Sequence, residues 1–254
     1  MAWQDDIYDA FVEAKIRQVA FVPDAGHKDV IRRCLETPSM RAVSMTTEED
    51  GIALLAGAWL GGDRGAMLMQ SSGVGNCINM LSLTKVCQFP LVTLVTMRGE
   101  WGEFNTWQIP MGRTTEAHLE LCGLVCYRCD TPDSVGDTVR AGIRYAYNTN
   151  SAVAVLLGQR LIGAKVFEAG GNAMSALHRR EVVKSLLSNR GDTMVVTGLG
   201  QSTYDAFAAG DDPRTFYLWG AMGGSVPIGL GMAIAQPERR TVVLTGDGEL
   251  LVGL

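Results

Sequence analysis

The sequence predicts an α/β protein built from two doubly wound parallel-sheet domains, the second of them incomplete. Short β-branched and apolar runs alternate with segments of helical periodicity along most of the chain. This alternation lapses once, in a polar stretch containing several glycines at 163–175, and then resumes. A Gly-rich stretch at 219–248 follows in the second part, at a place where open α/β sheets bind ligands. We therefore predict a first domain at 1–162, a linker at 163–175 and a second domain at 176–254.

The composition limits the classes of function. A chain of 254 residues can form two cores of medium size. It is 47% hydrophobic with a formal net charge of −5, which argues against a disordered chain and against nucleic-acid binding through bulk charge. No apolar run is long enough to span a membrane, and the acidic N-terminus is unlike a signal peptide. We expect a cytoplasmic protein with neither a nucleic-acid nor a membrane partner.

In the first domain, helical and strand-like segments follow one another in order. Helices are expected at 5–14, 27–35, 48–58, 115–122 and 134–148, with one more running from a Gly-rich turn at 71–76 through Val86. Strands are expected at 18–22, 42–45, 65–70, 91–97, 125–128 and 152–157. Thr46 and Thr47 are expected to cap the helix that begins at Glu48, and 98–113 is expected to be a long polar loop. Helices should therefore cover both faces of a parallel sheet.

The second domain shows the same alternation over a shorter length. Its expected elements are helices at 176–187, after a turn at 198–202, and at 225–235, with strands at 193–197, 215–218 and 241–245. Pro237 prevents the third helix from continuing. The last strand ends in Gly246-Asp247-Gly248, where glycines let backbone N–H groups approach a phosphate and the carboxylate can hold a divalent cation. Asp-Gly is also a common turn, so this motif alone does not decide the function.

The six cysteines do not indicate a disulfide framework in a chain of this size. Cys122, Cys126 and Cys129 lie close together in the sequence, with His118 before them, which leaves a zinc site open. They lack the usual spacing of two ligand pairs. We favour small apolar thiols at a helix end and in a buried strand.

Four motifs of the first domain resemble one family. T-T-E-E-D-G-I-A-L-L-A-G-A-W-L-G-G, L-M-Q-S-S-G-V-G-N-C-I-N, V-T-M-R-G-E and Q-I-P-M-G-R, taken together and in order, resemble the pyrimidine-binding domain of sulfopyruvate decarboxylase and of the related phosphonopyruvate decarboxylase. The second domain looks like the diphosphate-binding domain of the same thiamine-diphosphate enzymes. The resemblance covers nearly the whole chain.

The resemblance implies decarboxylation of a 3-substituted pyruvate with thiamine diphosphate and Mg²⁺. The substrate would be a small acidic 2-keto acid such as 3-sulfopyruvate, which gives sulfoacetaldehyde, or 3-phosphonopyruvate. The family implies a homodimer or homotetramer with sites between subunits. Glu48 matches the family's catalytic carboxylate, nine residues before Gly57. A glutamate favoured at a helix N-terminus by the helix dipole is the alternative explanation of Glu48.

The same resemblance implies which residues bind the cofactor. Met222 stands where the family has an apolar wedge under the cofactor, the Gly220 carbonyl would accept from its amino group, and Asp247 would bind Mg²⁺. Met222 as an ordinary core residue is the alternative. The full set of expected cofactor contacts is Gly200, Gln201, Ser202, Gly220, Met222, Gly223, Gly246, Asp247 and Gly248.

An acidic substrate requires cations and hydrogen-bond donors. The side chains expected to supply them lie after the first strand, in the Gly-rich turn and on the long loop. They are His27, Lys28, Ser72, Asn76, Arg98, Gln108 and Arg113. Solvated surface charge, or a turn role for Ser72 and Asn76, explains each of them equally well.

The sequence departs from the family at its end. The family's metal site also uses an asparagine beyond Asp247, and the sequence stops at Leu254, before that point. We therefore expect a truncated second domain with strand 241–245 at an exposed sheet edge. A non-catalytic or partner-completed subunit is the main alternative function. A dinucleotide-binding oxidoreductase is weaker, because Tyr204 and Asp205 follow Gly198-Leu199-Gly200 where a third glycine is needed.

Overall fold

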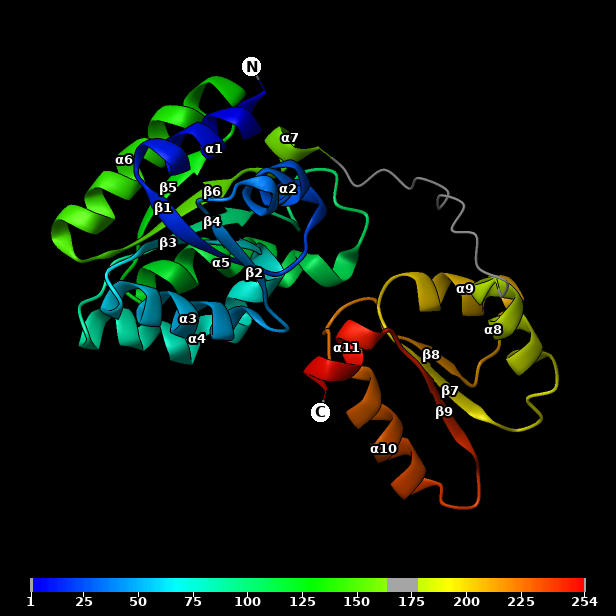
Figure 1. The fold of residues 1–254 in the computed structure, drawn as a ribbon. Coiled ribbons are helices and arrows are strands. Elements are labelled where there is room, and N and C mark those ends of the chain that lie inside the picture. Colours follow the sequence, from blue (N-terminus) through cyan, green and yellow to red (C-terminus); the bar gives the residue numbers. More distant parts are fainter. Residues whose placement is uncertain (1, 164–177, 254) are drawn as a thin grey trace. The chain divides into compact units, whose positions relative to one another are not determined.

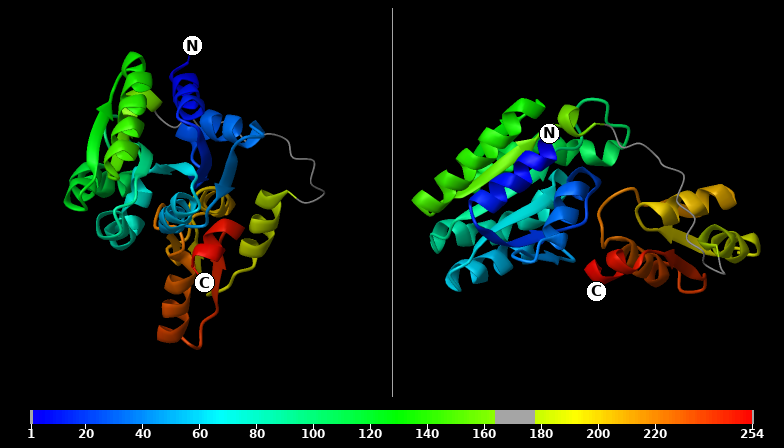
Figure 2. Two further views of the ribbon diagram at one scale, coloured as in Figure 1. Left: turned by 60° about the vertical axis from the view of Figure 1, so that its left-hand side comes forward. Right: turned by 45° about the horizontal axis from the view of Figure 1, so that its top comes forward.

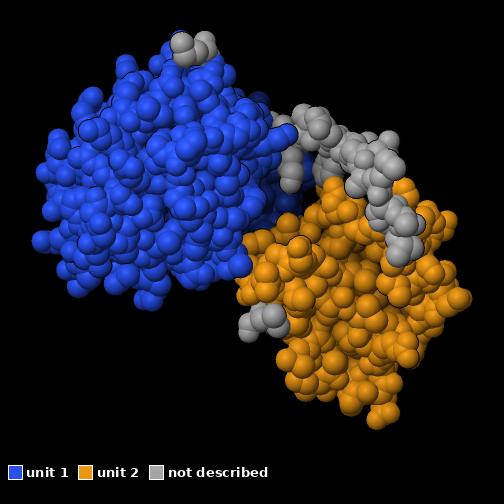
Figure 3. Space-filling view, viewed as in Figure 1, with its two compact units in different colours: residues 1–166 blue, residues 167–254 orange. Residues whose placement is uncertain are grey.

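The computed structural model describes residues 2–163 and 178–253. The chain divides into two compact units, unit 1 at residues 1–166 and unit 2 at residues 167–254, which Figure 3 colours separately. Each unit contains a parallel sheet with helices packed on it, so the predicted fold class is confirmed. The predicted linker lies outside the described residues apart from Gly163. In the described part of the chain, no helix is both long enough and apolar enough to cross a membrane.

Unit 1 follows the predicted alternation of strands and helices (Figure 1). Its strands are β1 (Ile16–Phe21), β2 (Arg41–Ser44), β3 (Arg64–Gln70), β4 (Leu91–Thr96), β5 (Val125–Cys129) and β6 (Ala152–Leu157). Its helices are α1 (Trp3–Glu13), α2 (Lys28–Glu36), α3 (Glu48–Leu60), α4 (Ser71–Val86), α5 (Ile109–Leu121), α6 (Pro132–Thr149) and α7 (Gln159–Ile162), with short 3-10 turns η1 (Ala25–His27) and η2 (Thr106–Gln108).

The sheet of unit 1 has the order β2-β1-β3-β4-β6-β5, and all of its pairings are parallel. In the register of β3 with β4, Gln70 lies opposite Thr96, and in that of β1 with β3, Phe21 lies opposite Leu68. The carboxyl ends of β1, β3 and β4 therefore meet at one edge of the sheet. Side chains that follow these three strands are brought together although they are far apart in the sequence.

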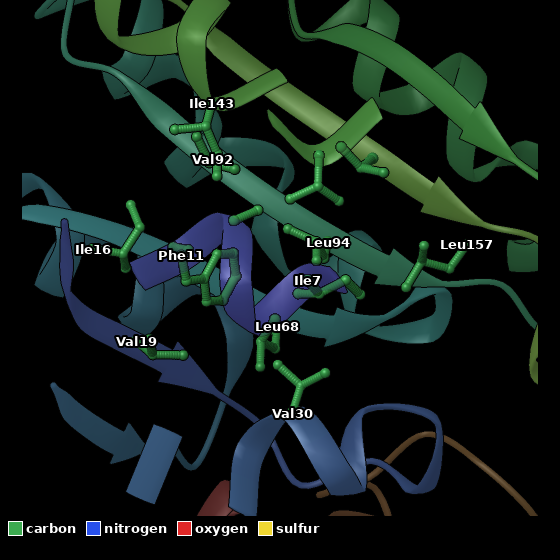
Figure 4. Close-up of a cluster of buried hydrophobic side chains, with 14 of the residues drawn as sticks. Ile7, Phe11, Ile16, Val19, Val30, Leu68, Val92, Leu94, Ile143 and Leu157 are labelled. Carbon is green, nitrogen blue, oxygen red and sulfur yellow. The ribbon is translucent and has the colours of Figure 1, made fainter. Parts of the chain in front are cut away.

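Two hydrophobic cores lie on the two faces of this sheet. One contains residues of α1, α2 and α6, and the other contains residues of α3, α4 and α5. Successive residues of β3 alternate between them, with Leu68 in the first core and Met67 and Met69 in the second, as the two-residue period of a strand requires. Figure 4 shows Ile7 and Phe11 of α1 packed among strand residues of the first core, and Figure 2 shows the two helical layers.

Unit 2 is a smaller version of the same architecture. Its described elements are α8 (Arg179–Ser188), β7 (Met194–Thr197), α9 (Gln201–Ala209), β8 (Thr215–Tyr217), α10 (Ser225–Ala235), β9 (Thr241–Leu244) and α11 (Asp247–Val252). The three strands are parallel in the order β8-β7-β9. Strand β9 thus lies at an edge of the described sheet, as predicted. Helix α10 packs closely on β9. Gly229 permits this contact, since the Val243 side chain occupies the space that a Cβ at position 229 would need.

Several segments differ from their predicted structure. The stretch 71–76 is not a turn but the first part of α4, which follows β3 with no residue between them. Helix α5 begins at Ile109, inside the expected loop, with Pro110 in the first turn, where a missing N–H costs nothing. Thr47 is the N-cap residue of α3, but its hydroxyl binds the Glu49 carboxylate and caps no N–H group. Asp247 opens a helix and does not lie in a simple turn.

The first core predicts a large effect of truncating Phe11, which is fully buried. We expect Phe11→Ala to lower the free energy of unfolding of unit 1 by about 3–5 kcal/mol, because it removes buried apolar surface and leaves a cavity. Val12→Ala is the matched control, since Val12 is 49% exposed on the same helix. Urea denaturation would measure both, and equal losses from the two variants would contradict this packing.

Candidate functional site

Glu48 lies at the start of α3, and its carboxyl group is buried against α4. We call the two α4 residues that contact this carboxyl group, Gly73 and Asn76, the seat of Glu48. Glu48 is only 5% exposed. Asn76 Nδ2 donates a hydrogen bond to Glu48 Oε2 over 3.0 Å. One turn earlier on α4, Gly73 leaves the space that the Glu48 side chain occupies, since a Cβ at Gly73 would overlap that carboxyl group. Gly73 and Asn76 lie three residues apart and so face the same side of their helix.

Burial changes the acidity of Glu48. Desolvation raises the pKa of its carboxyl above the ordinary value, and the hydrogen bond from Asn76 offsets only part of this effect. The neighbouring charge of Glu49 adds to the rise. Glu48 therefore holds a proton more readily than an exposed glutamate does. Such a carboxyl group is suited to exchanging a proton with a bound ligand.

Asp24 is a second buried carboxylate of unit 1, at the carboxyl end of β1. Its Oδ2 accepts from Thr96 Oγ1 at 2.8 Å and from the Gly26 N–H at 2.9 Å. Its Oδ1 accepts from Gln70 Nε2 at 2.9 Å and lies 4.0 Å from Arg98 Nη2. Burial acts to raise the pKa of Asp24, but the nearby His27 ring, the hydrogen bonds and Arg98 outweigh it, and the pKa lies below its ordinary value. Asp24 is thus held as an anion.

Gln70 extends these contacts to two residues that the sequence analysis selected. Its Oε1 accepts from Ser72 Oγ at 2.7 Å and from Gln108 Nε2 at 3.2 Å. Arg98 contributes its side chain from the end of β4, and its backbone N–H donates to Ser71 Oγ at 3.0 Å. Three of the expected substrate residues, Ser72, Arg98 and Gln108, therefore converge on Asp24 and Gln70. We call these five residues the Asp24 network.

The remaining expected substrate residues are not joined to Asp24 or Gln70 by the hydrogen bonds described above, although His27 lies near Asp24 and Lys28 lines a pocket to which Asp24 also contributes. His27 is fully buried and its Nε2 lies 3.1 Å from the Leu94 carbonyl, while burial lowers the pKa of its ring. These facts count against His27 as an exposed cation that touches substrate. Lys28 lines a mainly apolar surface pocket of α2 together with Ile31 and Leu35. Arg113 is exposed on α5, and Asn76 binds Glu48 as described above.

In unit 2, the expected cofactor residues follow the carboxyl ends of the three parallel strands β7, β8 and β9. Gly200 has a φ of 84° and precedes α9, whose first N–H groups are not paired within the helix and can bind an anion. Ser202 Oγ donates to the Gly198 carbonyl at 3.0 Å, and Gln201 Oε1 accepts from Arg179 at 3.1 Å. Contacts from Gln201 and Ser202 to a ligand would therefore come chiefly from their backbone.

The turn before α10 contains a strained residue that the sequence analysis did not select. Ala221 has a φ of 50°, in the region that disfavours residues with a Cβ, and such strain is concentrated at functional sites. Met222 is 37% exposed and is thus not a core residue. Gly223 has a different reason to be glycine from the expected one, because a Cβ there would collide with Val252 of α11. Gly220 precedes this turn.

The two glycines of the Gly246-Asp247-Gly248 motif border open space. A Cβ at Gly246 or Gly248 would meet no atom of the described chain within 4 Å, so packing inside unit 2 does not explain these glycines. A group held close to the backbone does explain them. Asp247 is exposed and can offer carboxylate oxygens to a cation. This end of the unit 2 sheet therefore presents open backbone N–H groups and one exposed carboxylate, which are the groups that a diphosphate and a divalent cation require.

Glu249 is a further residue that the sequence analysis missed. It is 6% exposed, and its Oε2 accepts the Leu199 N–H at 3.1 Å. This contact joins the segment after β7 to α11. Its Oε1 is buried and has no hydrogen-bond partner among the described residues. The sequence feature that could have identified Glu249 is its position two residues after Asp247, the expected metal ligand.

The zinc hypothesis receives no support. The described residues contain no group of three or more His, Cys, Asp and Glu side chains placed to hold a metal ion. All six cysteines are free. Burial raises the pKa of Cys126 to about 12, so this thiol is not prepared for metal binding.

Comparison with known proteins adds independent information. Residues 198–253 match the family described as "Thiamine pyrophosphate enzyme, C-terminal TPP binding domain". The chain is 31% identical over 258 residues to the phosphonopyruvate decarboxylase of Streptomyces viridochromogenes, in a match that covers 94% of this chain and 65% of that protein. It is 34% identical over 151 residues to the sulfopyruvate decarboxylase subunit alpha of Methanocaldococcus jannaschii, which covers 59% of this chain and 89% of that subunit.

The fold has a similar solved structure. The thiamine diphosphate-dependent 4-hydroxybenzoylformate decarboxylase of Rhodococcus jostii RHA1 aligns with a TM-score of 0.53 at 15% sequence identity, covering 82% of this chain and 41% of that one. This likeness concerns the fold alone. The chain spans slightly less than two thirds of the length of the phosphonopyruvate decarboxylase it matches.

The seat of Glu48 predicts that Gly73 cannot accept a side chain. We expect Gly73→Ala to lower the free energy of unfolding by about 1–3 kcal/mol, because the new methyl group overpacks the Glu48 carboxyl. Gly75→Ala is the matched control on the same helix, where the methyl group would make ordinary contact with Met111 at 3.5 Å. It should stabilise α4 by up to about 1 kcal/mol. Chemical denaturation would compare the two, and equal effects would disprove the seat.

The raised pKa of Glu48 predicts how stability depends on pH. Because the folded pKa exceeds the unfolded one, ionisation of Glu48 removes stability as the pH rises through the folded value. We expect Glu48→Gln to raise the free energy of unfolding at pH 8, and the gain to disappear below the ordinary value of 4.5, where the carboxyl is protonated in both states. Denaturation across this range would measure it. Glu120→Gln on the exposed face of α5 is the control, and a gain independent of pH would contradict the prediction.

Proposed function

The chain belongs to the family of thiamine-diphosphate-dependent decarboxylases that includes the sulfopyruvate and phosphonopyruvate enzymes, and from this premise we propose that it decarboxylates a 3-substituted pyruvate. The observation that carries the proposal is the buried Glu48 carboxyl on its seat in α4. In the reaction the bond between C1 and C2 of the keto acid breaks, C1 leaves as CO2, and a proton replaces it to give the aldehyde. With 3-sulfopyruvate the product is sulfoacetaldehyde.

Thiamine diphosphate supplies the electron sink that carbon–carbon cleavage of a 2-keto acid requires. Glu48 would hold or release a proton at a ring nitrogen of the pyrimidine, and its raised pKa suits that exchange. The diphosphate would lie against Gly246, Gly248 and the start of α9, with Asp247 as the Mg²⁺ ligand. The residues assigned to cofactor binding are Gly200, Gln201, Ser202, Gly220, Met222, Gly223, Gly246, Asp247 and Gly248.

The Asp24 network supports an acidic substrate. Arg98 is 5% exposed at its side chain, and within the described residues its guanidinium donates to the Gly163 carbonyl at 3.4 Å and faces Asp24 at 4.0 Å. A guanidinium has five N–H donors, so donors remain for a carboxylate, sulfonate or phosphonate. Ser72 and Gln108 add hydroxyl and amide groups. We assign substrate binding to these three residues.

The assembly is also part of the proposal. One relative is named as a subunit alpha, so that protein works with another subunit. We propose that this chain forms a homodimer or homotetramer with cofactor sites between subunits, as the family resemblance implies. Sedimentation equilibrium of the full chain would measure the oligomeric state, and a monomer that turns over substrate would contradict this assembly.

A partner-completed subunit is the second candidate. One observation favours it: the described residues offer Asp247 to a cation but gather no cluster of three ligand side chains around it. Mg²⁺ prefers six oxygen ligands, so water, the diphosphate or another polypeptide would have to supply the others. In this case the chain alone would bind thiamine diphosphate weakly and would not turn over substrate.

Calorimetric titration with thiamine diphosphate, with and without Mg²⁺, separates the two candidates. We expect binding in the micromolar range that requires Mg²⁺, and an Asp247→Ala variant that loses it, because the carboxylate links the cation to the protein. An Asp211→Ala variant, which removes an exposed carboxylate far from the motif in sequence, is the control. Absence of Mg²⁺-dependent binding by the intact chain would favour the partner-completed subunit.

Replacing Glu48 tests the catalytic role directly. We expect Glu48→Gln to lower the rate of CO2 release from 3-sulfopyruvate by at least about 100-fold, within the range that a positioned acid–base group contributes. The variant should still fold and bind the cofactor, which calorimetry would confirm. Glu49→Gln is the control, as its neighbouring carboxyl binds Thr47 and not Asn76. Retained CO2 release by Glu48→Gln would overturn the assignment.

A further inference from the structure

Asp24 determines the direction of the hydrogen bonds in the Asp24 network. An ionised carboxylate accepts hydrogen bonds and donates none, so the Gln70 amide must present its Nε2 to Asp24. Gln70 Oε1 then faces the other way and is an acceptor for Ser72 and Gln108. The donor direction of each residue therefore follows from one buried charge. Removing that charge would free the amide to rotate.

Asp24 is also a counter-ion of Arg98. Both side chains are at least nine-tenths buried, and the gap between Oδ1 and Nη2 is 4.0 Å, which is longer than a direct hydrogen bond. The hydrogen bonds that Asp24 accepts come from the uncharged donors Gln70, Thr96 and Gly26. The charge of Arg98 is thus balanced by Asp24, while most of its N–H groups are not used by the described chain. An arriving anion would compete with Asp24 for this charge.

We propose that Asp24 is a specificity-determining residue of the substrate site: it sets how strongly Arg98 binds an anionic group and fixes the donor directions of Ser72 and Gln108. The ligand class is a small carboxylate that carries a second acidic group, sulfonate or phosphonate. This inference rests on the proposed function, since it takes Arg98, Ser72 and Gln108 as substrate residues. Asp24 itself acts through them and touches no reacting atom.

The test is the affinity of the full chain for sulfoacetate, a stable compound with one carboxylate and one sulfonate. We expect Asp24→Asn to bind sulfoacetate at least about threefold more tightly than the wild type, because Arg98 loses its counter-ion. The interaction of two unit charges about 4 Å apart exceeds the net contribution of the neutral hydrogen bonds of Ser72 and Gln108 that the freed amide would perturb. Isothermal calorimetry without cofactor would measure this affinity. Thermal unfolding would verify that the variant is folded. Unchanged or weaker binding by the folded variant would overturn the proposal.

A second variant restores the network by a different arrangement. In Asp24→Asn combined with Gln70→Glu, the carboxylate introduced at position 70 accepts from the amide introduced at position 24, from Ser72 and from Gln108. It also returns a negative charge close to Arg98. We expect the sulfoacetate affinity to fall back to within about twofold of the wild type, since the same charge and donor directions are present again. This variant also serves if Asp24→Asn alone does not fold. An affinity that differs from the wild type by about tenfold or more would contradict the proposed role.

Arg98→Met, made in the Asp24→Asn background, locates the bound anion. We expect it to abolish the gain, because methionine keeps an unbranched apolar stem and lacks the guanidinium. A gain that survives would show that the anion binds elsewhere, and the proposal would fail. Turnover of 3-sulfopyruvate by the wild type is assayed separately. If the wild type turns over 3-sulfopyruvate but Asp24→Asn does not change the anion affinity, only the role of Asp24 is overturned. If Asp24→Asn gives the expected gain in affinity but the wild type shows no turnover, only the proposed function is overturned.

Discussion

The adjacency of three parallel strand ends is the constraint on which the candidate site depends. Strands β1, β3 and β4 are neighbours in the sheet and point the same way, so Asp24, Gln70 and Thr96 meet at one edge. No local sequence motif could bring these residues together, since they are separated by tens of positions. The two packed cores on either face hold this edge in place. The polar network is thus a product of topology, and the chemistry proposed for it follows from that geometry.

The buried carboxyl groups of Asp24 and Glu48 are stabilised in two different ways. An unpaired charge in an apolar environment costs several kcal/mol, so a buried carboxyl must either find partners or take up a proton. Asp24 has hydrogen bonds on both oxygens and a cation nearby, which keeps it ionised. Among the described residues Glu48 accepts a hydrogen bond from the Asn76 side chain and one from its own backbone N–H, and burial outweighs them and raises its pKa. One carboxylate is consequently suited to a fixed electrostatic role, and the other to proton exchange.

Much of the fold could be predicted from the sequence because the strands are apolar and well separated by helical segments. Strand β6 and helix α10 have the bounds that their patterns predict. The pattern failed at 71–76, where two glycines suggest a turn but the segment is helical, and one of them, Gly73, makes room for the Glu48 side chain from another helix. It could not identify Asp24 or Gln70 as the centre of a network, because their importance arises from contacts across strands. It also could not show that the ring of His27, an expected substrate residue, is fully buried and contacts the Leu94 carbonyl of β4. The roles assigned to individual site residues remain proposals.

The direct passage from β3 into α4 restricts how this site can change during evolution. With no loop between Gln70 and Ser71, the residues that seat Glu48 are set by helical geometry alone. One inserted residue at this junction would rotate Gly73 and Asn76 by about 100° around the helix axis and remove both from Glu48. Insertions and deletions, which commonly diversify binding loops, would therefore disrupt the contacts of Glu48 with α4 at this junction. Changes at this junction that keep the contacts of Glu48 are thus limited to exchanges of side chains on a backbone of fixed length.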